Sequence, residues 1–201
     1  MINTFACKVV SLFVRNSRIE ENDREIFVFG LEIILSSVAS IITVFLISIP
    51  FRQFLGTVFY LIMFIIIRQF TGGYHANSYQ RCFFTFVFIY LLTTLLVLFV
   101  STETAQTLTI VFSWTSVFPV FLFAPVRNKN RELTLKETVK FRKISRMSVC
   151  LLAGLLTVSV FCHPDFSRIL LWGALALLTT AILIVVAVIK NGGLSNEKNR
   201  D

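Results

Sequence analysis

Six long stretches without a charged side chain dominate the pattern of hydrophobic and polar positions along the 201-residue chain. Each contains 15 to 23 residues, and a helix needs about 20 residues to cross the hydrocarbon core of a bilayer. The stretches are Ile33–Phe51, Gln53–Ile67, Cys82–Thr102, Thr104–Val126, Met147–Pro164 and Ile169–Ile189. The pattern predicts an all-α polytopic membrane protein, a single membrane domain over residues 1–201 with about six transmembrane helices. The shortest stretch, Gln53–Ile67, leaves a re-entrant segment as an alternative.

The segment before the first stretch, residues 1–25, has a different pattern. Its apolar run FACKVVSLFV is interrupted by Lys8, and charged residues continue to Arg24, which is not the pattern of a cleavable signal peptide. We interpret it as an N-terminal amphipathic helix in the cytoplasmic membrane interface. The alternative is a helix packed on the cytoplasmic ends of the bundle.

The basic residues are distributed unevenly between the two sides that alternating helices would define. Seventeen of the 19 Lys and Arg residues fall in the N-terminal segment, the second and fourth connections and the C-terminal tail, and two fall on the other side. The positive-inside rule therefore predicts that both termini are cytoplasmic. The connections that contain residues 68–82 and 127–146 are then cytoplasmic too, provided that Gln53–Ile67 spans the membrane.

Composition supports this class of protein, with 56% hydrophobic residues, 22 phenylalanines and a mean hydropathy of +0.80. We expect a multi-pass protein of the cell membrane that has no nucleic-acid partner. Four cysteines without CxxC spacing and only two histidines make a zinc site with three or four such ligands hard to assemble. We therefore expect free thiols, no metal and no cofactor.

One predicted cytoplasmic connection, RQFTGGYHANSYQRC from Arg68 to Cys82, interrupts the apolar sequence with residues that can carry chemistry. Gly72 and Gly73 allow backbone angles that turn the chain back. Asn77, followed three residues later by Gln80, resembles a capping box that opens the next helix.

His75 and Cys82 are the candidate catalytic pair in this connection. In one continuous helix they would lie ~10.5 Å apart along the axis, too far for proton transfer. If the chain turns back before the helix, the imidazole can approach the thiol, and the helix N-terminus favours the thiolate. Cys82 would be the nucleophile and His75 its base and later its acid. The alternative is a small packing cysteine and an interfacial polar histidine.

The connection resembles the signature of the accessory gene regulator B (AgrB) family. In that signature an Arg ends a helix, a Gly lies two residues before the catalytic His, and six residues separate this His from the catalytic Cys. The resemblance covers most of the chain and extends to Gly30-Leu31-Glu32 and to Ala124-Pro125-Val126, which is followed by a basic segment with Lys129, Asn130 and Arg131.

The resemblance implies a membrane cysteine endopeptidase that processes an AgrD-like precursor peptide into a cyclic quorum-sensing signal. His75 and Cys82 match the catalytic pair, and Arg68 and Gly73 match positions that the family needs around it. In this family a side-chain nucleophile of the peptide, typically a cysteine, resolves the acyl-enzyme and closes a thiolactone. Lactone formation, simple hydrolysis by an intramembrane protease, and a non-enzymatic transporter or sensor subunit are the alternatives.

Glu32 lies about two turns into the first apolar segment, and an ionisable side chain at membrane depth is a functional candidate by default. It could orient His75 or pair with Arg68. The alternative is a solvated or locally hydrogen-bonded carboxylate near the cytoplasmic interface.

Residues 127–146 form a predicted basic cytoplasmic loop with eight basic and two acidic residues. Part of this charge is expected to contact anionic membrane lipid. We expect Lys129, Arg131 and Lys136 to attract an acidic tail of the precursor. The oligomeric state is left open, with a homodimer as one alternative.

Overall fold

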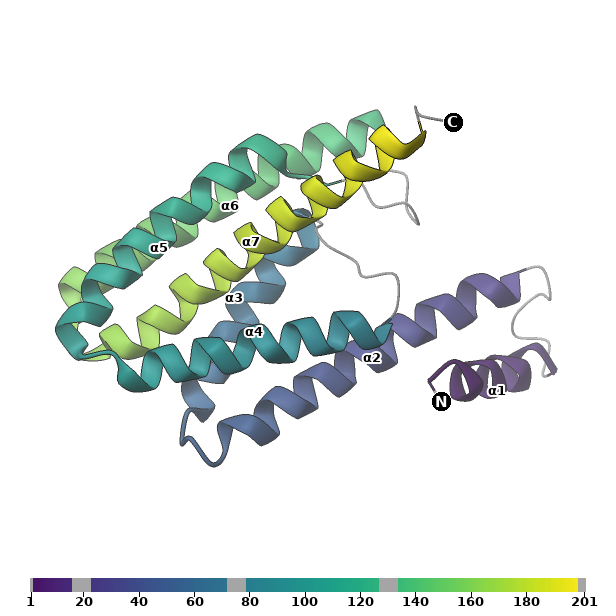
Figure 1. Cartoon of the computed structure of the whole chain (residues 1–201), viewed down its shortest axis with the longest axis horizontal. Coiled ribbons are helices and arrows are strands. Elements are labelled where there is room, and N and C mark those ends of the chain that lie inside the picture. Colours follow the sequence, from purple (N-terminus) through teal and green to yellow (C-terminus); the bar gives the residue numbers. More distant parts are fainter. Residues whose placement is uncertain (1, 16–22, 72–78, 127–133, 199–201) are drawn as a thin grey trace.

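The computed structural model describes residues 2–15, 23–71, 79–126 and 134–198, and every regular element in those ranges is a helix (Figure 1). The predicted all-α class is therefore confirmed. In chain order the elements are α1 (Ile2–Arg15), α2 (Arg24–Ser48), α3 (Phe54–Thr71), α4 (Tyr79–Phe99), α5 (Thr102–Phe123), α6 (Leu135–Cys162), η2 (Pro164–Phe166) and α7 (Ser167–Lys198).

Within the described residues, five helical segments are long and apolar enough to cross a membrane: α2, α3, α5, α6 and Pro164–Ile189, which joins η2 to most of α7. Helix α4 adds a shorter apolar stretch, Phe83–Phe99. Its backbone runs for 21 residues, or about 31 Å at 1.5 Å per residue. The polytopic architecture that the apolar stretches predicted is confirmed.

Helix α3 matters most for the topology, because its apolar stretch was the shortest. It is one continuous helix of 18 residues that runs through Arg68 to Thr71. Arg68 lies beyond the charge-free stretch, and its long side chain packs over the Phe64 ring, with the guanidinium carbon 5.9 Å from the ring centroid. The re-entrant alternative therefore finds no support in the described helix.

The helices alternate in direction (Figure 1). The three short connections, at residues 49–53, 100–101 and 163–166, lie at the lower and left-hand side of the bundle. The C-terminal ends of α3 and α5 and the N-terminal end of α6 lie at the opposite side. The prediction of membrane orientation from the count of basic residues on each side depends on this alternation.

Helix α7 forms the centre of the bundle and packs against α3 and α5. Small side chains allow this close approach, as is usual where membrane helices meet. Gly56 of α3 is covered by the Trp172 indole, so close that a Cβ on Gly56 would clash with it. The buried face of α5 consists of Ala105, Thr109, Ser113, Ser116 and Val120.

A cluster of aromatic rings and hydroxyl groups joins α3, α4 and α7 inside the bundle. The Tyr60 hydroxyl donates to Thr179 Oγ1 at 3.1 Å, and the hydroxyls of Thr57 and Tyr90 are 2.5 Å apart. The Tyr60 and Tyr90 rings both pack against Trp172, with centroids 6.1 and 5.7 Å away. Each hydroxyl is satisfied inside the bundle, as a site without water requires.

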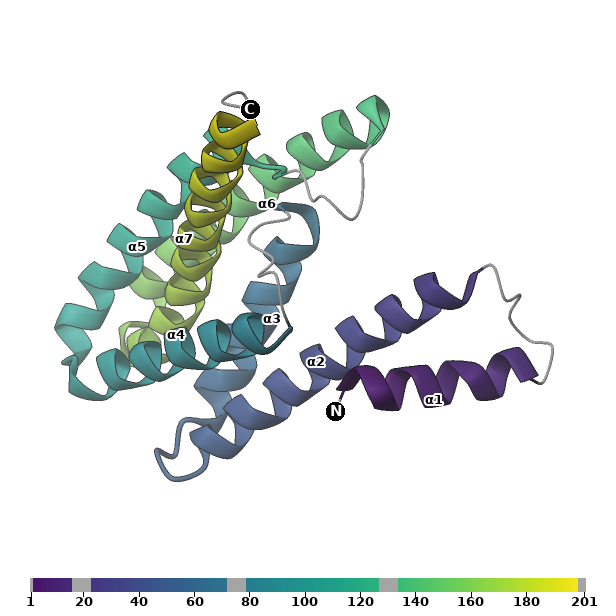
Figure 2. The same ribbon diagram turned by 45° about the vertical axis from the view of Figure 1, so that its right-hand side comes forward.

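Helix α1 packs along α2 (Figure 2). Ala6 and Val10 are buried, whereas Phe5, Leu12 and Phe13 remain exposed. An exposed apolar face beside a membrane helix suits the interfacial interpretation of this segment.

The prediction of a loop throughout residues 127–146 is wrong for its second half, because α6 begins at Leu135. A capping box starts this helix: Thr134 Oγ1 accepts from the Glu137 N–H at 3.3 Å, and the Glu137 carboxylate accepts from the Thr134 N–H at 2.9 Å. The first three turns of α6 carry basic residues on their exposed side. A search for charge-free stretches therefore misses the beginning of this helix.

Candidate active site

The end of α3 and the start of α4 flank the sequence signature, and both lie on the side of the bundle opposite the short connections (Figure 1). Arg68 is in the last turn of α3 and is half-buried over the Phe64 ring. The predicted position of an arginine at a helix end is therefore observed.

Helix α4 begins at Tyr79, so Cys82 lies at the end of its first turn. This backbone position agrees with the helix start that the signature predicted. Gly72, Gly73 and His75 lie outside the described residues, as does the side chain of Cys82. The His75–Cys82 pair therefore stays a prediction.

Glu32 is buried in α2, with 7% of its surface exposed. This burial does not fit the alternative in which Glu32 is a solvated carboxylate near the cytoplasmic interface. Helix α2 packs against α4, and Figures 1 and 2 show the first turns of α4 beside the middle of α2. Glu32 therefore belongs to a helix that contacts the Cys82 helix.

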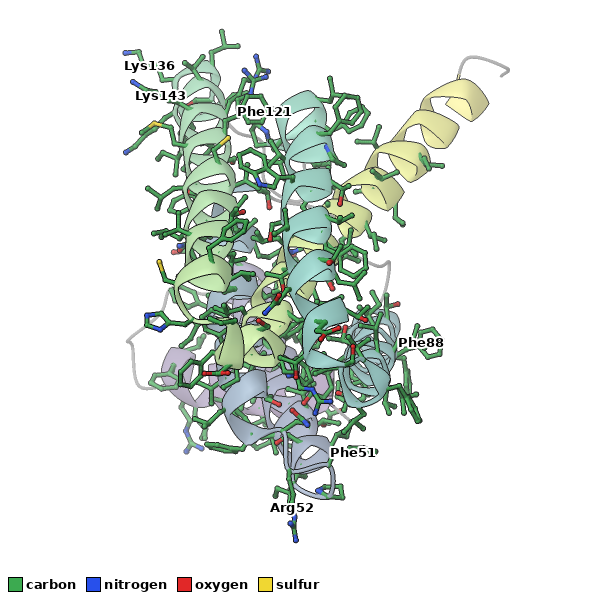
Figure 3. All side chains as sticks on the ribbon, turned by 90° about the vertical axis from the view of Figure 1, so that its left-hand side faces the viewer. Phe51, Arg52, Phe88, Phe121, Lys136 and Lys143 are labelled. Carbon is green, nitrogen blue, oxygen red and sulfur yellow. The ribbon has the colours of Figure 1, made fainter. Side chains whose placement is uncertain are left out.

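The basic residues at the start of α6 form an exposed face. Lys136, Lys140 and Lys143 follow at helical spacing and are exposed. Figure 3 shows Lys136 and Lys143 projecting from one end of the molecule, with Arg52 at the opposite end. Lys129 and Arg131 lie outside the described residues. Of the three predicted precursor-binding residues, Lys136 is thus described and accessible.

The end of α3 is bound by two residues, Ser145 and Val126, to which the sequence analysis gave no individual role. Ser145 of α6 donates from Oγ to the Phe70 carbonyl at 2.9 Å, and the Val126 N–H donates to the Thr71 carbonyl at 3.0 Å. Val126 belongs to the Ala124-Pro125-Val126 motif, which the sequence analysis noted as part of the family resemblance but to which it assigned no function. Ser145 carried no local signal, because its partner is 75 residues away.

Cys150 and Cys162 carry free thiols, half-buried and exposed respectively. Among the residues that the structure describes, no three His, Cys, Asp or Glu side chains come together as a metal site requires. Of the predicted site residues, the structure thus describes the side chains of Arg68, Glu32 and Lys136, which lie on three different helices.

These features define a class: an all-helical, multi-pass membrane protein that has an exposed basic face on one helix and a cysteine in the first turn of another. The family model described as "Accessory gene regulator B" matches residues 6–188. The chain therefore belongs to the accessory gene regulator B (AgrB) family, and the predicted family is confirmed. Membership supports a role in agr quorum-sensing peptide processing at the cell membrane.

A protein of Clostridium perfringens (strain SM101 / Type A), described as AgrB-like, is 25% identical to the chain over 171 residues. The alignment covers 81% of this chain and 80% of that protein. No solved structure matches the chain.

Proposed function

We propose that this protein is a cysteine endopeptidase that cleaves an AgrD-type precursor peptide through Cys82 and releases it as a cyclic peptide. One observation carries the proposal: α4 begins at Tyr79, so the first helical turn ends at the cysteine of the signature. In general, the first N–H groups of an α-helix have no partner within the helix and carry partial positive charge. Such a position favours the thiolate form of a cysteine, which is the nucleophilic form.

The first half of the reaction is an acyl transfer to sulfur. His75 takes the proton of Cys82, and the thiolate attacks the scissile carbonyl of the precursor. The C–N bond breaks, His75 returns its proton to the leaving amine, and the N-terminal part of the peptide stays on Cys82 as a thioester.

The second half resolves this thioester within the peptide. The side-chain thiol or hydroxyl of the peptide loses its proton to His75 and attacks the thioester carbonyl, which forms the ring and expels the Cys82 thiolate. Exchange of one thioester for another is nearly isoenergetic, so the site must hold the nucleophile close and keep water out. A site at the mouth of a membrane helix suits both requirements.

Recruitment of the precursor is assigned to the basic segment before α6 and to the start of that helix. Lys129, Arg131 and Lys136 would attract an acidic tail of the peptide. The exposed lysines that follow Lys136 on α6 extend the same positive field.

Cleavage of the precursor in membranes that contain this protein tests the proposal. We expect Cys82→Ala to abolish cleavage and His75→Ala to reduce it at least about a hundredfold, the usual worth of a positioned acid or base. Cys150→Ala and Cys162→Ala are the matched controls and should keep most of the activity. Cleavage that survives Cys82→Ala would exclude the cysteine endopeptidase and favour a transporter or sensor subunit.

A further inference from the structure

The last turn of α3 ends in backbone carbonyls that find no donor within the helix. Two of them are bound by residues far away in the sequence. The Phe70 carbonyl accepts from Ser145 Oγ at 2.9 Å, and the Thr71 carbonyl accepts from the Val126 N–H at 3.0 Å. Ser145 and Thr71 are both 0% exposed, so solvent cannot replace these bonds. The end of α3 is therefore held by α6 and by the segment that follows α5.

Helix α6 holds Phe70 through two residues one turn apart. The Phe141 ring packs edge-on against the Phe70 ring, with the centroids 6.2 Å apart and the planes at 62°. The Ser145 hydroxyl is also 2.6 Å from the Phe141 carbonyl of its own helix, so its single hydrogen is shared between two acceptors. The backbone and the ring of Phe70 are thus both in contact with the same face of α6.

The end of α5 is fixed to α6 by Arg146. The Phe121 carbonyl would ordinarily accept from the N–H four residues later, but that residue is Pro125, which has none. Arg146 supplies the missing donor from Nη2 at 2.7 Å, and its guanidinium carbon lies 5.2 Å from the Phe121 ring centroid. Arg146 thus joins α6 to the end of α5, and Val126 follows that end in the chain.

We infer that Ser145 is a positioning residue for acyl-enzyme formation, acting with Val126 as a clamp on the end of α3. The inference rests on the proposed function, because the chain runs from Thr71 into the connection that ends at Cys82. The basic segment 127–133 begins directly after Val126. The catalytic and the precursor-binding connections therefore begin next to each other, at the hydrogen-bonded pair of Thr71 and Val126.

A distance measurement tests the clamp without any catalysis. Spin labels at Gln69 and Lys140, both exposed, report the position of the end of α3 relative to α6 in a protein whose native cysteines are replaced. We expect Ser145→Ala to broaden the distance distribution. The matched control is Ser116→Ala, another fully buried serine, whose hydroxyl donates to the Phe112 carbonyl of its own helix. An unchanged distribution in Ser145→Ala would overturn the clamp.

The kinetics of acyl-enzyme formation test the positioning role. The rate is measured per folded molecule as a function of precursor concentration. We expect Ser145→Ala to lower the maximal rate about tenfold, since a misplacement near 1 Å can cost up to about a hundredfold. The half-saturating precursor concentration should not change, and Ser116→Ala should change neither quantity.

The outcomes separate the two proposals. An unchanged maximal rate in Ser145→Ala, with only less folded protein, would reduce Ser145 to a structural residue and overturn its positioning role. Absence of any acyl-enzyme in the unsubstituted protein would overturn the proposed function instead. The distance measurement would then still decide whether the clamp exists.

Discussion

Two glycines show, at the scale of single residues, how closely the helices of this bundle approach. A Cβ on Gly56 would clash with the indole of the buried Trp172, whereas a Cβ on Gly154 would meet nothing within 4 Å. Trp172 also packs against Tyr60 and Tyr90, so the indole cannot move aside without disturbing both rings. Gly56 is therefore required by packing.

We predict that Gly56→Ala lowers the free energy of unfolding by about 1–3 kcal/mol, the usual cost of overpacking a core. The apparent melting temperature in detergent should fall accordingly. Gly154→Ala is the control and should leave it unchanged or raise it, since alanine is the better helix former. Equal stability of Gly56→Ala and the unsubstituted protein would contradict the packing of α3 on α7.

The helix positions of two signature residues could be predicted from the sequence, whereas the residues that bind the end of α3 could not. Arg68 was expected at a helix end and is found there, and the helix that contains Cys82 begins where the signature indicated. The hydrogen bonds of Ser145 and Val126 to the end of α3 could not be predicted. Their partners are 75 and 55 residues away in the sequence, and such a contact produces no pattern of hydrophobic and polar positions in either segment.

Helix α6 combines two roles at the scale of a single element. Its second half is an apolar membrane helix, and its first three turns carry exposed lysines on one side and Ser145 on the buried side. The prediction of a loop here failed because the Thr134–Glu137 capping box lies within a charged stretch. The proposed precursor-binding residue Lys136 is therefore held on a helix.

The charge on this element gives a second prediction. Replacing Lys129, Arg131 and Lys136 with Gln should weaken binding of the precursor and make binding less sensitive to salt, while membrane insertion stays intact. Binding is measured at several salt concentrations. The control replaces the three basic residues of the C-terminal tail, Lys190, Lys198 and Arg200, and removes the same charge. If the two triple variants weaken precursor binding equally, the charge of Lys129, Arg131 and Lys136 acts only by attraction to anionic lipid.

The whole molecule is an alternating bundle, and this determines which connections share a side of the membrane. The apolar stretches predicted this architecture because hydrocarbon requires long helices whose backbone polar groups are satisfied internally. The mutual packing was beyond prediction, since the small residues on the buried face of α5 recur at helical spacing but do not indicate which helix packs against them. The orientation in the membrane rests on the distribution of basic residues.

We predict that single cysteines at Gly73 and Lys136 are labelled by a membrane-impermeant reagent only from the cytoplasmic side. Cysteines at Glu103 and Asp165, which are exposed at the other side of the bundle, should be labelled from outside. Intact cells and inverted vesicles give the two measurements. Labelling of Gly73 from outside would contradict the orientation and remove the site from the compartment that contains the precursor.

Intact-mass measurement of the protein tests the claim that Cys82 carries the peptide as a thioester. The precursor is used with its internal nucleophile changed to Ala, so that attack can occur but ring closure cannot. We predict a hydroxylamine-sensitive adduct with the mass of the N-terminal part of the peptide, absent in Cys82→Ala and strongly reduced in His75→Ala. Cleaved peptide without any adduct on the protein would contradict the claim and indicate simple hydrolysis.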